Sequence, residues 1–218
     1  MESTGMSDRS ARRLALGLGV LVLALWSSAL APGGPSYDDL EGVAANPLVN
    51  GERSPLAALT TDYWHHRGDA GHLRPLALWS LALDHRLFGA WWPGFHLTGL
   101  LWNAAVVVAG CLVVAALGRR LGIASEVRRA GMVGLALAMC HPLLADSMAW
   151  VSGRTSPMSV LPGLLACLVL LRLPAGRQVF TIIPASVAGI TAAECRAPSS
   201  ARRALGPTRW PLALWRSR

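Results

Sequence analysis

The chain has 218 residues, of which 53% are hydrophobic and only 15% are charged, and its mean hydropathy is +0.42. This composition is more apolar than a soluble domain needs and indicates an integral membrane protein. All twenty basic residues are arginine and the net charge is +8. The arginines flank apolar segments or lie near the C-terminal end and form no aromatic-interleaved basic patch, so we expect no nucleic-acid partner.

The first apolar run follows Arg12 and Arg13 and covers residues 14–31. It is just long enough to cross a hydrocarbon core about 30 Å thick. Its last residues, Ala29-Leu30-Ala31, also match a signal-peptidase site, so a cleaved secretory signal is an alternative to an uncleaved helix. Both interpretations place residues 1–13 in the cytoplasm and the following residues outside it.

Residues 32–94 form a long polar interval that we expect to be an extracytoplasmic loop. Within it, residues 75–87 space their apolar side chains as an amphipathic helix does and include Trp79. This pattern favours a helix that lies at the membrane surface rather than one that crosses the bilayer.

Three more apolar segments predict further spans, at residues 95–117, 130–148 and 157–173. The connection 118–129 carries four arginines and one glutamate, which is typical of a cytoplasmic loop, and the turn 149–156 then lies outside. Pro142 should interrupt the third span and kink it. We therefore predict an all-α, polytopic membrane protein with about four transmembrane helices, interfacial helices in its first loop and both termini in the cytoplasm.

The acidic pair Asp38 and Asp39 follows the first span. Two adjacent carboxylates repel each other, so that one is available as a general base, or the pair shares a divalent cation. The alternative is a solvated loop in which a carboxylate caps a short helix. The sequence leaves both interpretations open.

A second polar cluster lies at the outer end of the third span, between His141 and Arg154, and includes Asp146 and Trp150. Ionisable groups at that depth are costly unless they find a partner or reach water, which makes them candidates for a functional site. The alternative is a polar helix end with a tryptophan of the interfacial aromatic belt. The predicted topology places this cluster on the same side of the membrane as the loop that contains Asp62 and Arg74.

The polar motifs occur in an order that resembles a known family. The motifs are Asp38-Asp39, Asn46-Pro47, Thr61-Asp62-Tyr63-Trp64, Arg74-Pro75-Leu76, Gly94-Phe95-His96-Leu97, His141-Pro142 and Trp150-Val151-Ser152-Gly153-Arg154. Together they resemble the N-terminal membrane portion of the transmembrane and tetratricopeptide-repeat O-mannosyltransferases and their bacterial relatives, which are glycosyltransferases of the GT-C type. The resemblance covers roughly Tyr37 to Leu173.

This resemblance implies a polyprenyl-phosphate-linked sugar as the donor and a protein hydroxyl as the acceptor, with transfer on the extracytoplasmic face. It implies that Asp38 or Asp39 acts as the catalytic base. If a divalent cation takes part, the acidic pair is the candidate to hold it. Arg74 and Arg154 would bind the donor phosphate, unless they anchor the chain at the interface or pair with a loop aspartate. Supporting roles fall to Asp62, His141, Asp146 and Trp150, although His141 beside a proline is also explained by local packing.

The chain departs from the family pattern in several places. Asp146 stands where the family has a glutamate, and Ser156 stands where it commonly has an aspartate. No helical repeat of roughly 34 residues follows, and residues 174–218 form a basic tail that we expect to be poorly ordered. The change of composition after Arg172 suggests a shifted reading frame or a truncated gene.

Two main functions therefore stand beside each other. The first is a glycosyltransferase, or a fragment of one, for which we expect the bacterial inner membrane in preference to the endoplasmic reticulum. The second is a non-catalytic membrane scaffold or accessory protein derived from the same family. A transporter ranks last, because the charges gather at helix ends and no internal repeat is visible. A homo-oligomer or a larger membrane complex would cover the polar groups that face outward.

Overall fold

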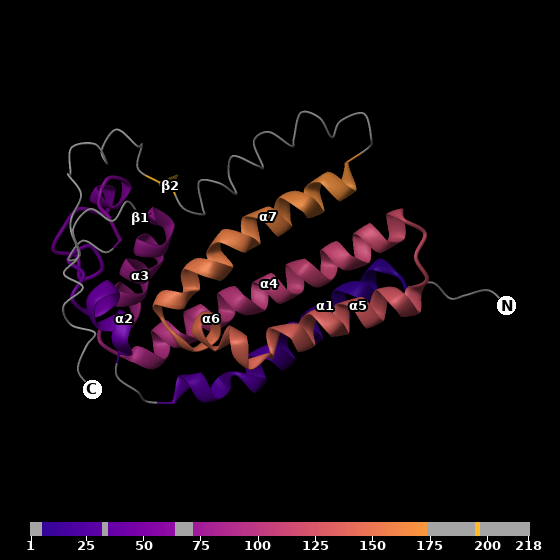
Figure 1. Ribbon diagram of the computed structural model, residues 1–218, viewed down its shortest axis with the longest axis horizontal. Coiled ribbons are helices and arrows are strands. Elements are labelled where there is room, and N and C mark those ends of the chain that lie inside the picture. Colours follow the sequence, from indigo (N-terminus) through magenta and orange to yellow (C-terminus); the bar gives the residue numbers. More distant parts are fainter. Residues whose placement is uncertain (1–5, 32–34, 64–71, 174–194, 197–218) are drawn as a thin grey trace, which may run out of the picture.

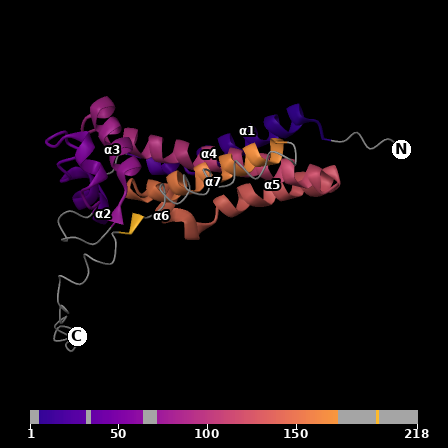
Figure 2. The same cartoon turned by 90° about the horizontal axis from the view of Figure 1, so that it is seen from above.

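The structure is a computed structural model that describes residues 6–31, 35–63, 72–173 and 195–196. Over these residues the fold is almost entirely helical. Four long helices run along the longest axis of the molecule: α1 (Asp8–Leu25), α4 (Trp92–Arg120), α5 (Ser125–Met139) and α7 (Thr155–Arg172). Short helices and loops gather at one end of this bundle, as Figures 1 and 2 show.

Helix α4 is the centre of the bundle, because α1, α5 and α7 all pack against it. Small side chains allow these helices to approach closely, as is common where helices pack in a membrane. A Cβ atom added to Gly110 of α4 would lie 2.7 Å from the side chain of Leu135 in α5, and one added to Gly19 of α1 would lie 2.8 Å from that of Val108. The first core cluster lies between α1, α4 and α5 and includes Ala15, Val107 and Met132.

Helix α1 begins earlier than the apolar run predicted. Ser7 caps it by accepting a hydrogen bond from the backbone N–H of Ser10 at 3.2 Å, so the charged residues that precede the run join the helix. The helix ends at Leu25, and a 3₁₀ helix at Ser27–Leu30 continues the chain. The helical segment therefore starts at Asp8 rather than at residue 14.

The break predicted at Pro142 is present, but as an interruption of the helix rather than a kink. Helix α5 ends at Met139, because a residue that precedes proline is disfavoured in helical conformation. The side chain of His141 then accepts a hydrogen bond from the backbone N–H of Leu143 at 3.2 Å and caps the 3₁₀ helix Pro142–Leu144. The short helix α6 (Ala145–Ala149) follows.

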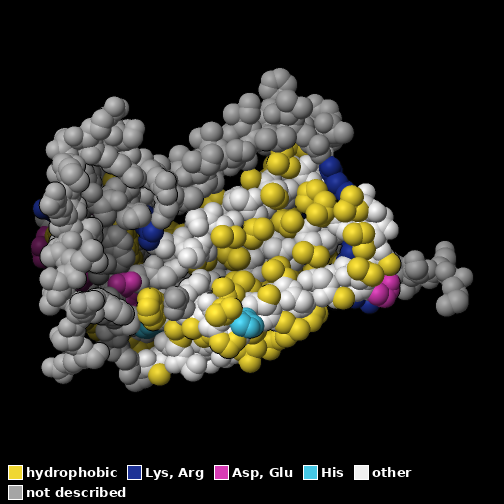
Figure 3. All heavy atoms as spheres, in the orientation of Figure 1, with side chains coloured by type: hydrophobic (Ala, Val, Ile, Leu, Met, Phe, Trp, Pro, Cys, Tyr) yellow, Lys and Arg dark blue, Asp and Glu magenta, His cyan; other side chains and the backbone are white. Residues whose placement is uncertain are grey.

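Two helical segments in the described part of the chain are long and apolar enough to cross a membrane, α4 and Ser152–Arg172. Helix α5, with 15 residues, is too short to be counted among them. Helix α1 is not counted either, because it carries four charged residues in its first turns. Figure 3 shows hydrophobic side chains spread over the face that α4, α5 and α7 present. The two segments indicate membrane association, while the predicted arrangement of four spans stays a prediction.

The polar end contains α2 (Tyr37–Asp39), a π-helical turn Leu40–Ala44, a 3₁₀ helix Pro55–Leu59 and α3 (Pro75–Phe88). Helix α3 has almost the bounds that its amphipathic pattern predicted. Two residues before it, β1 (His72–Leu73) pairs antiparallel with β2 (Cys195–Arg196). The remainder of the predicted basic tail, residues 174–194 and 197–218, lies outside the described residues.

Charge is distributed unevenly between the two ends of the bundle. The end formed by the start of α1, the α4–α5 connection and the end of α7 has eight arginines among the described residues and two acids. The arginines are Arg9, Arg12, Arg13, Arg119, Arg120, Arg128, Arg129 and Arg172, and the acids are Asp8 and Glu126. The opposite end contains the remaining acidic residues that the structure describes.

Candidate functional site at the polar end of the bundle

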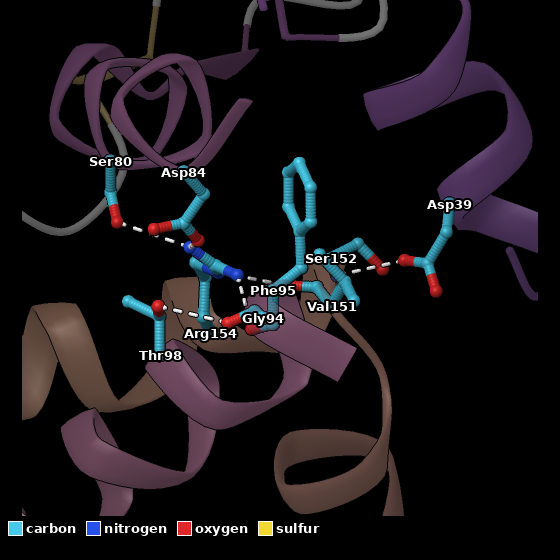
Figure 4. A network of polar contacts seen from close by, with 9 residues as sticks. All are labelled: Asp39, Ser80, Asp84, Gly94, Phe95, Thr98, Val151, Ser152 and Arg154. Carbon is cyan, nitrogen blue, oxygen red and sulfur yellow. Dashed lines mark hydrogen bonds and ion pairs between the residues drawn. The ribbon is translucent and has the colours of Figure 1, made fainter. Parts of the chain in front are cut away.

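Arg154 is fully buried at the polar end, with 0% of its surface exposed. It lies in the 3₁₀ helix Ser152–Arg154 directly before α7. Its Nη1 forms an ion pair with the carboxylate of Asp84 and donates to Ser80 Oγ at 3.2 Å. Its Nη2 donates to the backbone oxygen of Phe95 at 2.7 Å and its Nε to that of Val151 at 3.1 Å. Figure 4 shows how this one side chain connects α3, the start of α4 and the start of α7.

The partner of Arg154 is equally enclosed, because only 3% of the Asp84 side chain is exposed. Burial raises the pKa of Asp84, and the charge and hydrogen bond of Arg154 counteract that rise. A buried ion pair of this kind adds little net stability over an apolar pair, but its loss is costly when one charge is left behind. The pair therefore fixes the relative position of α3 and α7.

These contacts fit one of the alternatives that the sequence left open for Arg154. All three nitrogens of its guanidinium donate to protein acceptors, and the side chain has no exposed surface with which to meet a lipid phosphate. The ion pair with Asp84 is the salt bridge to an aspartate of the first loop that the sequence allowed as an alternative. Arg154 is a positioning residue in this arrangement.

Asp39 is also buried, with 0% exposure, and both of its carboxylate oxygens accept hydrogen bonds. Oδ1 accepts from the backbone N–H of Ser152 at 2.8 Å, which fastens α2 to the segment before α7. Oδ2 accepts from the hydroxyl of Ser36 at 2.6 Å and completes a capping box at the start of α2. The helix-capping alternative is therefore correct for Asp39.

An open pocket of about 210 Å³ lies next to these contacts. Its lining combines residues from α2, from the loop before α3, from α6 and from the turn before α7. The lining residues are Asp38, Tyr63, Arg74, Leu143, Ser147, Trp150, Ser152, Gly153 and Ser156. The pocket thus brings together three of the residues singled out in the sequence, namely Asp38, Arg74 and Trp150, with several hydroxyl groups.

Arg74 is half-buried at this pocket and is held from two sides. Its guanidinium carbon lies 5.4 Å from the ring centroid of Tyr63, a cation–π distance, and its Nη1 donates to Thr155 Oγ1 at 3.5 Å. Tyr63 is itself buried, and burial raises the pKa of its phenol to about 12, against the opposing charge of Arg74. The phenol therefore stays protonated near neutral pH, and the local positive charge belongs to Arg74.

The other predicted residues have different positions. His141 is exposed and caps a 3₁₀ helix, as its packing alternative suggested. Asp62 is buried and is not among the residues that line the pocket. Asp146 belongs to α6, but its side chain is outside the described part. Trp150 is 38% exposed at the rim of the pocket.

The two carboxylates of the acidic pair have different surroundings in the structure. Asp39 turns both oxygens to protein donors, whereas Asp38 lines the pocket. Among the described residues, no group of three or more histidine, cysteine, aspartate or glutamate side chains is arranged to hold a metal ion.

Sequence reasoning overlooked a buried asparagine that supports the pocket. Asn103 is 1% exposed within α4, and its Nδ2 donates to the backbone oxygens of Gly99 at 3.1 Å and Ser147 at 2.9 Å. The second bond holds α6 against α4, and Ser147 lines the pocket. Asn103 is a polar residue inside an apolar run. A polar group at that depth in a membrane needs a partner, and this argument, which was applied to the cluster between His141 and Arg154, would have selected Asn103 as well.

Comparison with known proteins supports a glycosyltransferase relationship for the chain. Over 137 residues, or 61% of the chain, the sequence is 22% identical to a protein O-mannosyl-transferase of Caenorhabditis elegans. The match covers 19% of that relative, so the chain spans only a small part of its length. No protein-family model matches the sequence, and no solved structure matches it.

Proposed function

We propose that this chain forms the pocket-bearing part of a membrane glycosyltransferase that transfers a sugar from a polyprenyl-phosphate carrier to a protein hydroxyl on the extracytoplasmic face. The observation that carries the proposal is the pocket in which a carboxylate, Asp38, and a guanidinium, Arg74, line one opening at the end of apolar helices. The partial similarity to a protein O-mannosyl-transferase supports the reaction class.

The two charged groups suit the two halves of a glycosyl transfer. The acceptor hydroxyl attacks the anomeric carbon and loses its proton, and the Asp38 carboxylate is the group in the pocket that can accept it. The bond between the anomeric carbon and the phosphate oxygen breaks, and the phosphate leaves with the electron pair. Arg74 can neutralise that anion through charge-assisted hydrogen bonds.

The buried contacts around the pocket give these groups a fixed frame. Asp39 fastens the turn that carries Asp38 to Ser152, and Arg154 fixes the start of α7 against α3. Groups that are held in place before the substrate binds need less reorganisation during the reaction. We assign Asp39 and Arg154 to this positioning and assign contact with the substrate to Asp38 and Arg74.

The distribution of charge supports the orientation that we propose. By the positive-inside rule, the arginine-rich end of the bundle would face the cytoplasm, and the pocket would then open at the opposite face of the membrane. A donor in the outer leaflet and a protein acceptor in the extracytoplasmic space would then meet at the pocket. A bacterial inner membrane is the setting that we propose.

The test is a transfer assay on the full chain in liposomes, with undecaprenyl-phosphate-mannose as the donor and a serine- and threonine-rich peptide as the acceptor. Asp38→Asn should lower the rate by about 10²–10⁴-fold, the usual contribution of a general base. Glu41→Gln is the matched control, since it removes an exposed carboxylate of the neighbouring turn that does not line the pocket. Equal rates for Asp38→Asn and the unmodified chain would refute the assignment.

A non-catalytic scaffold is the second candidate, and one observation favours it. Two of the residues first selected for chemistry, Asp39 and Arg154, serve internal bonding instead. A chain that inserts and folds but transfers no sugar from any polyprenyl-phosphate donor would support this alternative.

A further inference from the structure

A second pocket lies at the arginine-rich end of the bundle, opposite the pocket that contains Asp38. It has a volume of about 310 Å³ and lies where α1 and α7 pack against α4. Its lining residues are Asp8, Ala11, Arg12, Leu112, Ala115, Ala116, Arg119, Leu168 and Arg172. None of them contributes to the proposed transfer reaction.

Three arginines from three different helices line this pocket. Arg12 comes from α1, Arg119 from α4 and Arg172 from α7. Asp8 pairs with Arg119 at 2.8 Å, in a contact that is partly exposed. One carboxylate against three guanidiniums leaves a net charge of about +2 at the opening, and this favours an anionic ligand.

The fold keeps these like charges together. Arg120 Nη2 donates to the backbone oxygen of Leu173 at 2.8 Å and fastens the end of α4 to the end of α7. The ion pair of Asp8 with Arg119 joins the start of α1 to the same end of α4. These two contacts join the three helix ends, and a bound anion would lower the repulsion among the arginines.

The inner wall of the pocket is apolar. Ala115 and Ala116 of α4 and Leu168 of α7 are buried in the bundle, and Leu112 is partly buried against them. A small inorganic anion would use only the charged opening. A ligand with an anionic head and a hydrocarbon tail would use both parts.

We propose that this pocket binds the phosphate group of an anionic membrane phospholipid, with the guanidiniums around the phosphate and an acyl chain against the apolar wall. The site lies at the end of apolar helices, where headgroups of the adjacent leaflet are found, and basic pockets between membrane helices suit such headgroups. The inference is independent of the proposed transfer reaction, because it concerns the other end of the bundle.

The test uses the full chain in detergent and measures lipid binding by native mass spectrometry. Phosphatidylglycerol should bind in preference to phosphatidylcholine. Each of Arg12→Gln, Arg119→Gln and Arg172→Gln should weaken the binding about fivefold, which corresponds to about 1 kcal/mol per arginine near a charged headgroup. The triple variant should then bind about a hundredfold more weakly.

The matched control is the triple variant Arg9→Gln, Arg13→Gln and Arg129→Gln. It removes three exposed arginines from the same end of the bundle that do not line the pocket, and it should change the affinity less than threefold. An equal loss in both triple variants would overturn the proposal in favour of a diffuse electrostatic attraction. Binding of inorganic phosphate with the same affinity as phosphatidylglycerol would also overturn it, because the apolar wall would then contribute nothing.

A substitution that should increase the affinity for the lipid keeps the proposal testable if the triple variant does not fold. Asp8→Asn removes the carboxylate of the pocket and should strengthen the binding of phosphatidylglycerol several-fold, although it also removes the ion pair with Arg119. A purely structural role of these residues predicts weaker binding for every substitution. Weaker binding in Asp8→Asn would therefore refute the assignment.

Discussion

The ion pair of Arg154 with Asp84 provides the sharpest test of how the polar end is held together. Arg154→Met removes the charge but retains a long apolar side chain. It leaves Asp84, whose side chain is only 3% exposed, without its counter-charge, and two backbone oxygens without their donors. The loss of one partner from a buried pair costs about 3–5 kcal/mol, and we expect a decrease of this size in the free energy of unfolding at pH 7.

The assay is unfolding in mixed micelles by titration with sodium dodecyl sulfate, followed by circular dichroism. The double variant Arg154→Met with Asp84→Leu should recover the larger part of the loss, because it removes the stranded carboxylate. A loss below about 1 kcal/mol in the single variant, or a double variant no more stable than the single one, would contradict this account of the pair.

The same variant should respond to pH in a defined direction. Burial raises the pKa of Asp84, and Arg154→Met removes the charge and the hydrogen bond of Arg154 that counteract this rise, so that the weaker opposing effect of the hydrogen bond from Thr98 remains. The folded state then binds a proton that the unfolded state has released above a pKa of about 4. The variant should therefore lose stability as the pH rises and regain part of it between pH 7 and pH 5. A deficit relative to the unmodified chain that is constant over this interval would be evidence against a stranded carboxylate.

Three further predictions concern the surroundings of the pocket. Asp39→Ala removes the carboxylate that accepts hydrogen bonds from Ser36 and Ser152, and it should lower the free energy of unfolding by about 1–3 kcal/mol in the same titration. A decrease near zero would show that these buried hydrogen bonds do not stabilise the fold. Gly94→Ala should destabilise the protein by about 1–3 kcal/mol because the added Cβ overlaps the ring of Phe88, whereas Gly99→Ala, which meets nothing within 4 Å, should stabilise it by up to about 1 kcal/mol. Tyr63 should ionise at a pKa of about 12 in an ultraviolet titration, and its contribution to stability should be lost as the pH rises from about 10 through 12; Tyr63→Phe should lack this transition.

The helices could be predicted from the sequence because hydropathy and periodicity act locally. The amphipathic pattern at residues 75–87 gave nearly the bounds of α3, and the apolar run at residues 95–117 lies inside α4. The start of α1 was missed because Ser7, a polar residue outside the apolar run, decides where that helix begins. The end of α5 was placed too late because the influence of Pro142 reaches back along the chain.

The site was harder to predict, since its contacts join residues far apart in the sequence. Asp38 and Asp39 are neighbours of the same type. Ser36 lies three residues before Asp39 and bonds to it locally, but the second contact of Asp39, with Ser152, depends on the fold. Arg154 was recognised as a charge that needs a partner, but Asp84 was one of several loop acids that could provide it. The contacts of Asp39, His141 and Arg154 fit the structural alternatives given for them. These were helix capping for Asp39, local packing for His141 and a salt bridge for Arg154.

The ion pair of Arg154 also has a consequence for the synthesis of the chain. Asp84 leaves the ribosome 70 residues before Arg154, so the nascent polypeptide carries an aspartate without a counter-charge while α4, α5 and α6 are still being made. Until α7 arrives, this carboxylate is most stable in water or in its protonated form. The ion pair therefore closes only after residue 154 has been made, and a ribosome that stalls before codon 154 would leave an intermediate whose α3 can pack against α4 but lacks its ion pair with the segment before α7.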